Sequence, residues 1–532
     1  RQLAGGDAIQ LTRGNTDDTH PSFSPDGSQI VFSSDRNGGG IYVISALGGE
    51  PRQLTNRGWR PRFSPDGRTI AYFTGPRSNS LTDERIFLVP VTGGEPVPFH
   101  PEFLSIRNPV WSPDGRRLLF MGRRDKADRW PDDADWWIAP VDGGDAKQID
   151  AFEVLGREAF IDYTVPEVWD AGNGILFSRR VADSTNVWRL PLSSDRRALP
   201  DLQQLTFGTG KEMEPNILPA GGLIFSNYTE RLNLWSLPID AAGRIGDDLQ
   251  PLTQGDTMAG SPTISLSGDQ LLFTADRGAG RQVWLRNLRT ASEAAVSPGG
   301  STVRGAVLSR DGRRVAWQVP EAAGTGLYTA ATTGGAPARI CTGCGGLMSG
   351  WTLDNRFLIN QSQVPSRFSQ LDVATRESRP LLAHPTRGVY SGNLSGDGHW
   401  LTFHAHVEDS AHGQQIYAAP LTRQPVDVAS WIPITSGEFE DDKPRWSAKG
   451  DAIYFTSLRD GYRCLWMQRV DPASKQPTGP AESIRHFHST RLGMMFPDLT
   501  LLGVSVARDR LVFTLVNRTA GIWMGTPAQA AQ

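Results

Sequence analysis

A four-residue turn recurs along this sequence and constrains its fold more than any other feature. Three near-identical copies, each preceded by an aromatic residue, are Ser24-Pro25-Asp26-Gly27, Ser64-Pro65-Asp66-Gly67 and Ser112-Pro113-Asp114-Gly115. Weaker or degenerate copies near residues 170, 219, 267, 309, 352, 395, 447 and 507 bring the total to about eleven, at a mean spacing of about 48 residues. Such regular spacing indicates one supersecondary unit that is stacked many times.

The first complete unit shows how the repeat folds. Pro25 presets the backbone of the turn, Asp26 can bond its own backbone, and Gly27 takes the positive φ that a tight hairpin requires. The turn joins a short strand to the more apolar stretch 29–34, and further Gly-rich turns lead to a third strand and a polar outer strand. Four antiparallel strands per unit make one propeller blade, which must stack radially because it cannot bury both faces alone. No segment shows a sustained 3.6-residue apolar period, which argues against an α/β or helical-repeat fold.

Eleven units exceed the four to eight blades that are usual for one propeller. We therefore expect an all-β protein of about eleven four-stranded antiparallel blades in two propellers, with one large ring as the alternative. No linker marks the boundary, and we place the propellers at residues 1–256 and 257–532. Residues 1–12 match the end of a third strand plus an outer strand, and the last unit stops after its third strand. Either the N-terminal strand completes the final blade, or an upstream blade has been cut away.

Charge and composition argue against nucleic acid as a partner and against a membrane span. Lys and Arg number 54 and Asp and Glu 57, so the net charge is −3, and we find no dense basic stripe of the kind that binds nucleic acid. No apolar run approaches the roughly 18 residues of a membrane span, so we expect no span in this chain. Three cysteines cannot supply a disulfide scaffold or a four-thiolate zinc site.

The repeat resembles a known family. The aromatic-Ser-Pro-Asp-Gly turn, the apolar strand that follows it, and the Gly-Gly-Glu-Pro-Arg-Gln-Leu-Thr segment at residues 48–55 are similar to the TolB-type or WD40-like (PD40) β-propeller repeat, over essentially the whole chain. Within that family, several stretches resemble the C-terminal propeller region of acidobacterial receptor-like Ser/Thr protein kinases, namely 33–42, 458–466, 485–488 and 506–513. In such proteins a cytoplasmic kinase domain and a transmembrane helix precede the propeller. This sequence contains neither a Gly-rich phosphate loop with its lysine nor a His-Arg-Asp loop.

The resemblance implies a binding function. We expect a ligand- or protein-binding propeller that forms the extracytoplasmic sensor region of a receptor-like kinase, at the periplasmic face of the inner membrane. The alternative is a free-standing TolB-like periplasmic scaffold that docks an envelope protein. Both imply a protein partner or a small ligand at the propeller funnel or rim, and no cofactor. Since the Gly-x-Ser-x-Gly nucleophile elbow is also missing, we expect no catalysis by this chain.

Two patches are expected to carry recognition. The acidic-aromatic insertion 123–137 interrupts a blade between its second and third strands, and Arg129, Trp130 and Trp136 there combine rings with charge, as interface anchors do. The alternative is a solvated loop in which Trp136 simply begins the next strand. His486 and His488 project to one face of an extended stretch, where they line a rim or serve in packing between blades.

The remaining candidates concern metals and disulfides. His404 and His406 share one face of a predicted strand, as metal ligands do, but no spaced Asp or Glu completes a set, so we expect packed or solvated histidines and no metal. Cys341 and Cys344 form a lone Cys-x-x-Cys, and the glycines beside it argue against the helix N-terminus that a redox motif needs. We expect a local disulfide in an oxidising compartment, with free thiols as the alternative.

Overall fold

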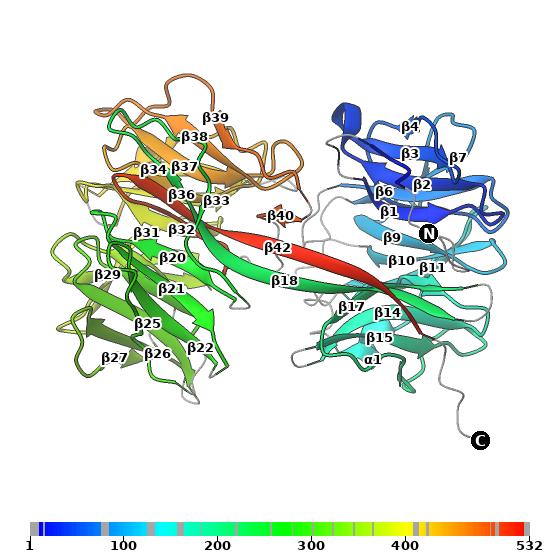
Figure 1. The fold of residues 1–532 in the computed structure, drawn as a ribbon, viewed down its shortest axis with the longest axis horizontal. Helices are drawn as coiled ribbons and strands as arrows, with labels where there is room; N and C mark the ends of the chain where they lie inside the picture. Colours follow the sequence, from blue (N-terminus) through cyan, green and yellow to red (C-terminus); the bar gives the residue numbers. More distant parts are fainter. Residues whose placement is uncertain are drawn as a thin grey trace. The chain divides into compact units, whose positions relative to one another are not determined.

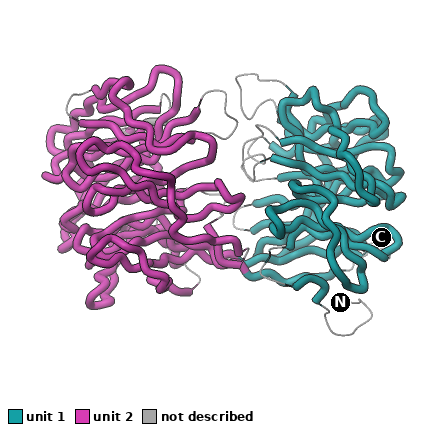
Figure 2. The backbone as a smooth tube through the Cα atoms, turned by 90° about the horizontal axis from the view of Figure 1, so that it is seen from above, with its two compact units in different colours: residues 1–229, 519–532 teal, residues 230–518 magenta. Residues whose placement is uncertain are grey.

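The protein is an assembly of antiparallel β-sheets, which divides by its internal contacts into two compact units. The first unit comprises residues 1–229 and 519–532, and the second comprises residues 230–518 (Figure 2). The computed structural model describes the whole chain except residues 1–9, 14–15, 17, 76–83, 125–133, 157–163, 182–183, 219–221, 256–257, 279, 300–302, 322–323, 344–345, 364–365, 408–413, 422–424, 490, 495–499 and 526–532.

The first unit begins with three separate four-stranded sheets and continues with a fourth set of four strands (Figure 1). The strands are β1 (Asp18–Phe23), β2 (Gln29–Ser34), β3 (Gly40–Ser45), β4 (Arg52–Thr55), β5 (Trp59–Phe63), β6 (Thr69–Thr74), β7 (Arg85–Pro90), β8 (Val97–Phe99), β9 (Ser105–Trp111), β10 (Arg117–Arg123), β11 (Ala134–Pro140), β12 (Lys147–Gln148), β13 (Val168–Trp169), β14 (Gly174–Val181), β15 (Ser184–Pro191) and β16 (Gln203–Gln204). Among the described residues of this unit, two short helices interrupt the strands, η1 (Arg36–Gly38) and α1 (Ala151–Leu155). A single parallel bridge between Thr185 and Lys211 joins β15 to the next strand, β17 (Lys211–Ile217).

The second unit contains five further four-stranded sheets, each built from strands consecutive in sequence. The strands are β20 (Gly260–Ile264), β21 (Gln270–Asp276), β22 (Arg281–Asn287), β23 (Glu293–Ala295), β24 (Gly305–Leu308), β25 (Arg314–Glu321), β26 (Gly324–Ala331), β27 (Ala338–Thr342), β28 (Leu347–Trp351), β29 (Phe357–Gln363), β30 (Ser366–Asp372), β31 (Ser378–Ala383), β32 (Val389–Leu394), β33 (Trp400–His406), β34 (Gln414–Pro420), β35 (Ile432–Pro433), β36 (Asp441–Trp446), β37 (Ala452–Ser457), β38 (Cys464–Arg469) and β39 (Glu482–Arg485), with the short helix η2 (Val428–Ser430) before β35.

Two 16-residue strands, β18 (Leu223–Pro238) and β42 (Arg510–Gly525), pair with each other and belong to both units (Figure 1). The Arg518 Nε donates to Glu230 Oε1 at 2.8 Å, and the Ile239 N–H donates to the Asp509 carbonyl at 2.7 Å. Residue numbers thus rise along one strand as they fall along the other, which makes the pair antiparallel.

These long strands complete one blade in each unit. In the second unit, the start of β42 pairs with β41 (Val504–Val506), and the end of β18 pairs with β19 (Gln250–Pro251). In the first unit, the start of β18 pairs with β17. A short strand, β40 (Leu492–Gly493), also pairs with β42.

The predicted all-β fold of stacked four-stranded blades is confirmed. Within the described residues, the sheets amount to five blades in the first unit and six in the second. One of the two alternatives was that the N-terminal strand completes the final blade; residues 1–9 lie outside the described part, and β18 and β19 supply strands of that blade. The expected division between residues 256 and 257 also falls on residues outside the described part.

The repeated turns are stabilised by Ser and Asp side chains that accept hydrogen bonds from backbone N–H groups of the turn. The Ser24 hydroxyl donates to Asp26 at 2.5 Å and accepts from the Gln29 N–H at 2.9 Å, while the Ser28 N–H donates to Asp26 at 3.0 Å. Gly27 has the expected positive φ of 71°. These hydrogen bonds from Ser24 and Ser28 lower the pKa of Asp26 to about 2. The turn therefore fixes the register of the first two strands of each blade.

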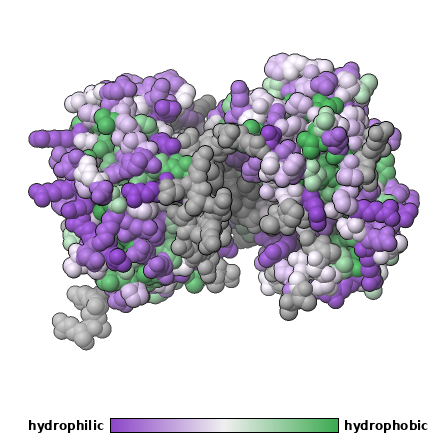
Figure 3. Space-filling view, turned by 180° about the vertical axis from the view of Figure 1, so that it is seen from behind, coloured by the Kyte–Doolittle hydropathy of each residue, from purple (hydrophilic) through white to green (hydrophobic). Residues whose placement is uncertain are grey.

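The hydrophobic core lies between neighbouring blades. Between the β5–β8 and β9–β12 sheets, for example, Phe99 meets Phe120 edge to face at 5.7 Å, and Phe103 meets Trp137 at 5.1 Å. Aromatic pairs of this geometry stabilise a core beyond the area that they bury. On the face shown in Figure 3, hydrophilic side chains predominate and the apolar patches are small.

Candidate functional site

The first strand of many blades carries a β-bulge with a residue in the left-handed region. In the second unit these residues include Ser261, Ser391 and Lys443, with φ between 51° and 57°. The pairing register shifts at the same places, for instance between Asp442 and Arg445. A bulge bends its strand and redirects its side chains.

The first strands of all six blades of the second unit surround a cavity of about 390 Å³, which we call the axial cavity. It is lined from β20, β24, β28, β32, β36 and β41, together with side chains of β33. Its charged lining consists of four cations and one carboxylate: Arg304, Arg310, Lys443, Arg445 and Asp442. The volume is within the range of small-molecule sites.

Asp442 is the centre of a polar network at the cavity wall. Its Oδ1 lies 3.0 Å from His404 Nδ1 and accepts from the Ser391 hydroxyl at 2.9 Å, and its Oδ2 lies 3.6 Å from Lys443 Nζ. Burial alone would raise the pKa of Asp442, but the charges of Lys443 and His404 outweigh it and hold this pKa well below its usual range. Asp442 is therefore a carboxylate whose charge is already matched by its neighbours.

Arg445 supplies a positive charge that carbonyl groups hold in place. Its Nε donates to the Val504 carbonyl at 2.7 Å, and its guanidinium also donates to the carbonyls of Pro444 and Ser391, at 2.8 and 3.4 Å. Burial lowers the pKa of Arg445 to about 10, which leaves it protonated at neutral pH. Since carbonyls orient a cation without neutralising it, the cavity lining keeps an excess of positive charge.

Aromatic rings complete the cavity wall. Tyr390 stacks on His404 with centroids 5.4 Å apart and meets His406 edge on at 5.2 Å. The two histidines thus share one face of β33, as expected, and both line the cavity. Burial, followed by the nearby His404, lowers the pKa of His406.

The first unit contains a charged cluster at and beside its own bulged strands. Arg60 lies 3.9 Å from Glu167 Oε2, His20 lies 3.9 Å from Glu214, and the Tyr228 hydroxyl donates to Glu214 at 2.6 Å. The Glu167 side chain is only 2% exposed, and its Oε2 has no hydrogen-bond partner within the described structure. Burial raises the pKa of Glu167 to about 7, although Arg60 opposes the shift.

The insertion predicted to carry recognition is described only in part. Arg129 and Trp130 lie outside the described residues. Trp136 is no exposed anchor, because it is 0% exposed and packs against the Phe177 ring with centroids 5.5 Å apart, which agrees with the alternative that it belongs to the next strand. The reason is that Trp136 belongs to β11, where alternation directs it into the core between blades.

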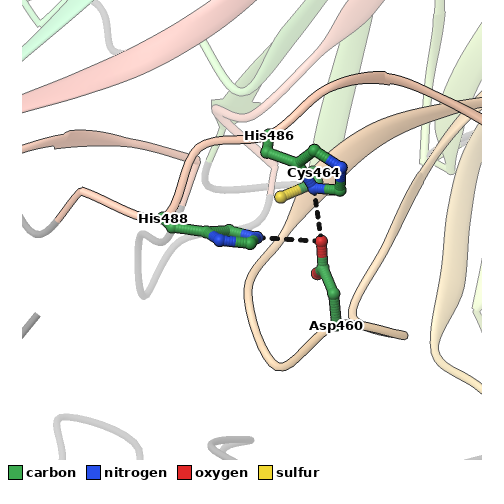
Figure 4. Close-up of side chains that lie close together, drawn as sticks. All are labelled: Asp460, Cys464, His486 and His488. Atoms are coloured by element: carbon green, nitrogen blue, oxygen red, sulfur yellow. Dashed lines mark hydrogen bonds and ion pairs between the residues drawn. The ribbon is translucent and has the colours of Figure 1, made fainter. Parts of the chain in front are cut away.

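His486 and His488 face one carboxylate, as Figure 4 shows. His486 Nδ1 and His488 Nε2 lie 2.6 and 2.9 Å from the same oxygen of Asp460, and the Cys464 thiol lies beside them. Both imidazoles are about half exposed, at 48% and 41%. The two histidines therefore point to one side of the chain, as the sequence indicated.

The cysteines are in two states. Cys341 is disulfide-bonded, Cys344 lies outside the described residues, and Cys464 is a free, buried thiol. Burial raises the pKa of Cys464 to about 12.

Sequence reasoning missed Asp442, Lys443, Asp460 and Cys464 as functional candidates. The sequence does contain a signal for Lys443. Several bulge residues, Lys443 among them, directly precede a proline in the first strand of a blade, so aligning the repeats on these residue–proline pairs locates the bulges. No comparable signal marks Asp460, which lies in a turn of variable sequence.

The fold is that of a β-propeller protein, and the N-terminal part of the chain carries a TolB-type repeat. Residues 2–86 match the family model described as PD40, TolB beta propeller domain, which confirms the predicted repeat. Among solved structures, the chain is similar to the putative TolB from Agrobacterium tumefaciens, at 18% identity and a TM-score of 0.41, over 55% of this chain and 99% of that one.

Two curated relatives carry peptidase names. The "Uncharacterized peptidase YuxL" of Bacillus subtilis (strain 168) is 27% identical over 160 residues, which cover 23% of this chain and 24% of the relative. "Dipeptidyl-peptidase 5" of Porphyromonas gingivalis is 24% identical over 159 residues, covering 27% of this chain and 22% of the relative. The chain thus spans less than a quarter of the length of each.

These relatives correct one expectation. The prediction that the chain is not an enzyme is wrong, because two of the relatives that it matches are named peptidases, which suggests a hydrolase-type propeller. The prediction relied on short motifs within this chain, whereas the match covers less than a quarter of each named peptidase. Among the described residues, no helix has the length and apolar character needed to cross a membrane.

Proposed function

We propose that this chain binds the carboxylate-bearing end of a short peptide in the axial cavity, as the substrate-selecting propeller of a peptidase-type protein. The observation that carries the proposal is the charge of the cavity lining, with four cations around one carboxylate. Asp442 is matched by Lys443 and His404, so the remaining positive charge is available to an anionic group. Concave walls of one sign concentrate ligands of the opposite charge.

The peptidase names of the two relatives favour a peptide over other anions. A peptide also fits the rest of the wall. Tyr390 and Met348 offer apolar contacts, and Gln361 and Gln414 offer amide groups that can pair with a peptide backbone.

A second proposal is that the axial cavity binds a signal ligand and that the propeller is the periplasmic sensor region of a receptor-like Ser/Thr kinase. The resemblance of residues 33–42 and 458–466 to such proteins supports this proposal. A free-standing TolB-like scaffold that docks an envelope protein is the third arrangement. The full-length gene product separates them: a peptidase domain, a kinase domain with a hydrophobic span, or a cleavable signal peptide alone.

The binding proposal is tested with fluorescently labelled peptides that have either a free or an amidated C-terminus. We expect the free carboxylate to bind more tightly, and Arg304→Met to weaken its binding by about tenfold or more, as loss of a charge-assisted contact does. Arg313→Met, at an exposed turn of the same blade, is the control and leaves affinity unchanged. Equal affinity for free and amidated peptides would contradict the proposal. Mass analysis of the recovered peptide shows whether it has been cleaved.

A further inference from the structure

Four potential metal ligands converge at the edge of the β36–β39 blade, away from the residues that line the axial cavity. They are Asp460, Cys464, His486 and His488, and one donor atom from each lies within 4.8 Å of all the others (Figure 4). Asp460 comes from the turn after β37, Cys464 begins β38, and the two histidines follow β39. Segments separated by more than 20 residues thus bring their donor groups to one point.

We propose that these four side chains bind one divalent transition-metal ion, and that Zn²⁺ is the ion that fits them. One thiolate, two imidazoles and one carboxylate make a four-ligand set of the kind that tetrahedral zinc sites use. Calcium and magnesium prefer oxygen ligands alone, so sulfur and nitrogen donors select against them.

The geometry needs only a small adjustment to hold the ion. Bond lengths of 2.0–2.3 Å place the donor atoms of a tetrahedral site about 3.3–3.8 Å apart. The present donors lie within 4.8 Å of one another, and the 2.6 and 2.9 Å pairs that Asp460 makes with His486 and His488 would open by less than about 1 Å to admit the ion. Asp460 Oδ2 already lies within 3 Å of both rings, so the carboxylate marks the position toward which the donors point.

Neighbouring groups orient the ligands as the outer shell of a metal site does. The second ring nitrogen of His486, Nε2, lies 2.7 Å from the Ser483 hydroxyl, which fixes the ring with Nδ1 directed at Asp460. The Phe487 N–H donates to the Cys464 sulfur at 3.2 Å, which holds this sulfur in position. The buried Phe487 side chain also holds the two flanking histidines on the opposite side of the chain. Such outer partners are a regular part of metal sites.

Binding is a simple exchange of protons for the ion. The Cys464 thiol proton and any proton on the ligating imidazole nitrogens pass to the buffer as the metal bonds form. No oxidation or reduction is involved. With all four positions filled by protein, the ion serves to link the turn after β37 to the segment after β39, as closed zinc sites do.

The test uses the full chain after treatment with a chelator and its removal. Titration calorimetry with ZnCl2 should show one ion per chain, and CoCl2 should give a thiolate-to-cobalt charge-transfer band. His488→Gln, at a half-exposed position, should weaken Zn²⁺ binding by about 100-fold or more, because even the loss of an outer-shell partner costs about 10–100-fold. Ser483→Ala should weaken it by about tenfold. His399→Gln, in the exposed turn before β33, is the matched control and should change nothing.

Three results would overturn the proposal. One is the absence of Zn²⁺ and Co²⁺ binding by the stripped chain. Another is binding that His488→Gln leaves as tight as in the unaltered chain. The third is cobalt binding without a charge-transfer band, which would remove Cys464 from the ligand set. Because His488 is half exposed, its substitution tests the site in a chain that keeps its fold.

Discussion

Glu167 offers a sharp test of the electrostatics inside the first unit. Its ordinary pKa of 4.5 rises to about 7 in the folded protein, because burial outweighs the attraction of Arg60. The unfolded chain therefore loses this proton near pH 4.5, whereas the folded chain keeps it to about pH 7. Between these values the folded state binds more protons, so this group makes the folded state less stable as pH rises.

The magnitude follows from the two pKa values. At 1.36 kcal/mol for each pH unit, a rise from 4.5 to about 7 corresponds to a loss of about 3 kcal/mol by pH 8. Glu167→Gln cannot ionise and avoids this loss. Relative to the unaltered chain, we expect the variant to gain about 3 kcal/mol of unfolding free energy between pH 4.5 and pH 8.

Chemical denaturation at a series of pH values from 4.5 to 8.5 measures this difference. Taking the variant minus the unaltered chain at each pH cancels the titration of the other carboxyl groups. Glu95→Gln, at an exposed position before β8, supplies the baseline for a Glu-to-Gln change. A Glu167→Gln difference that stays constant across this range would refute the reasoning, because it would show that Glu167 ionises equally in both states.

Three further predictions concern stability. Trp136→Ala should destabilise the first unit by about 3–5 kcal/mol, measured by calorimetric unfolding, because it removes a fully buried ring. Gly40→Ala should lower the free energy of unfolding by about 3 kcal/mol, because its Cβ would lie 1.9 Å from a backbone oxygen at a φ of 137°. Gly27→Ala should lower it by only about 1 kcal/mol, because the added Cβ meets no atom within 4 Å. Chemical denaturation measures both. Asp442→Asn should destabilise the chain above about pH 4, and the difference should shrink as pH falls through the lowered pKa of Asp442, in denaturation curves at pH 7 and pH 3.

The fold was predictable because its signals are local and repeated. The Ser-Pro-Asp-Gly turn needs only contacts within six residues, such as Ser24 to Asp26 and Gln29, so each copy specifies its hairpin independently. The sharing of β18 and β42 by the two units was not predictable in this way. It depends on pairing between residues almost 300 positions apart, such as Glu230 and Arg518, and such pairing produces no repeating pattern in the sequence.

The candidate sites show the same limit. His404 and His406 were visible from their spacing on one strand, and so were His486 and His488. Their partners were not, because Asp442 comes from the next blade and Asp460 from an irregular turn. Trp136 allowed two interpretations from the sequence, a ring beside a charged insertion or part of the next strand, and its burial supports the second.

The sharing of β18 and β42 also sets an order of events during synthesis. Residues 1–229 leave the ribosome first, yet the first unit also uses residues 519–532, which follow about 290 residues later. At 5–20 residues per second, that interval lasts roughly 15–60 s. During this interval the start of β18 lacks the strand that pairs with it in the finished protein. An unpaired strand edge can pair with other chains. The second unit therefore has all its strands before the first unit does. We expect the nascent chain to be most prone to aggregation while residues 230–518, which form the second unit, are being synthesised.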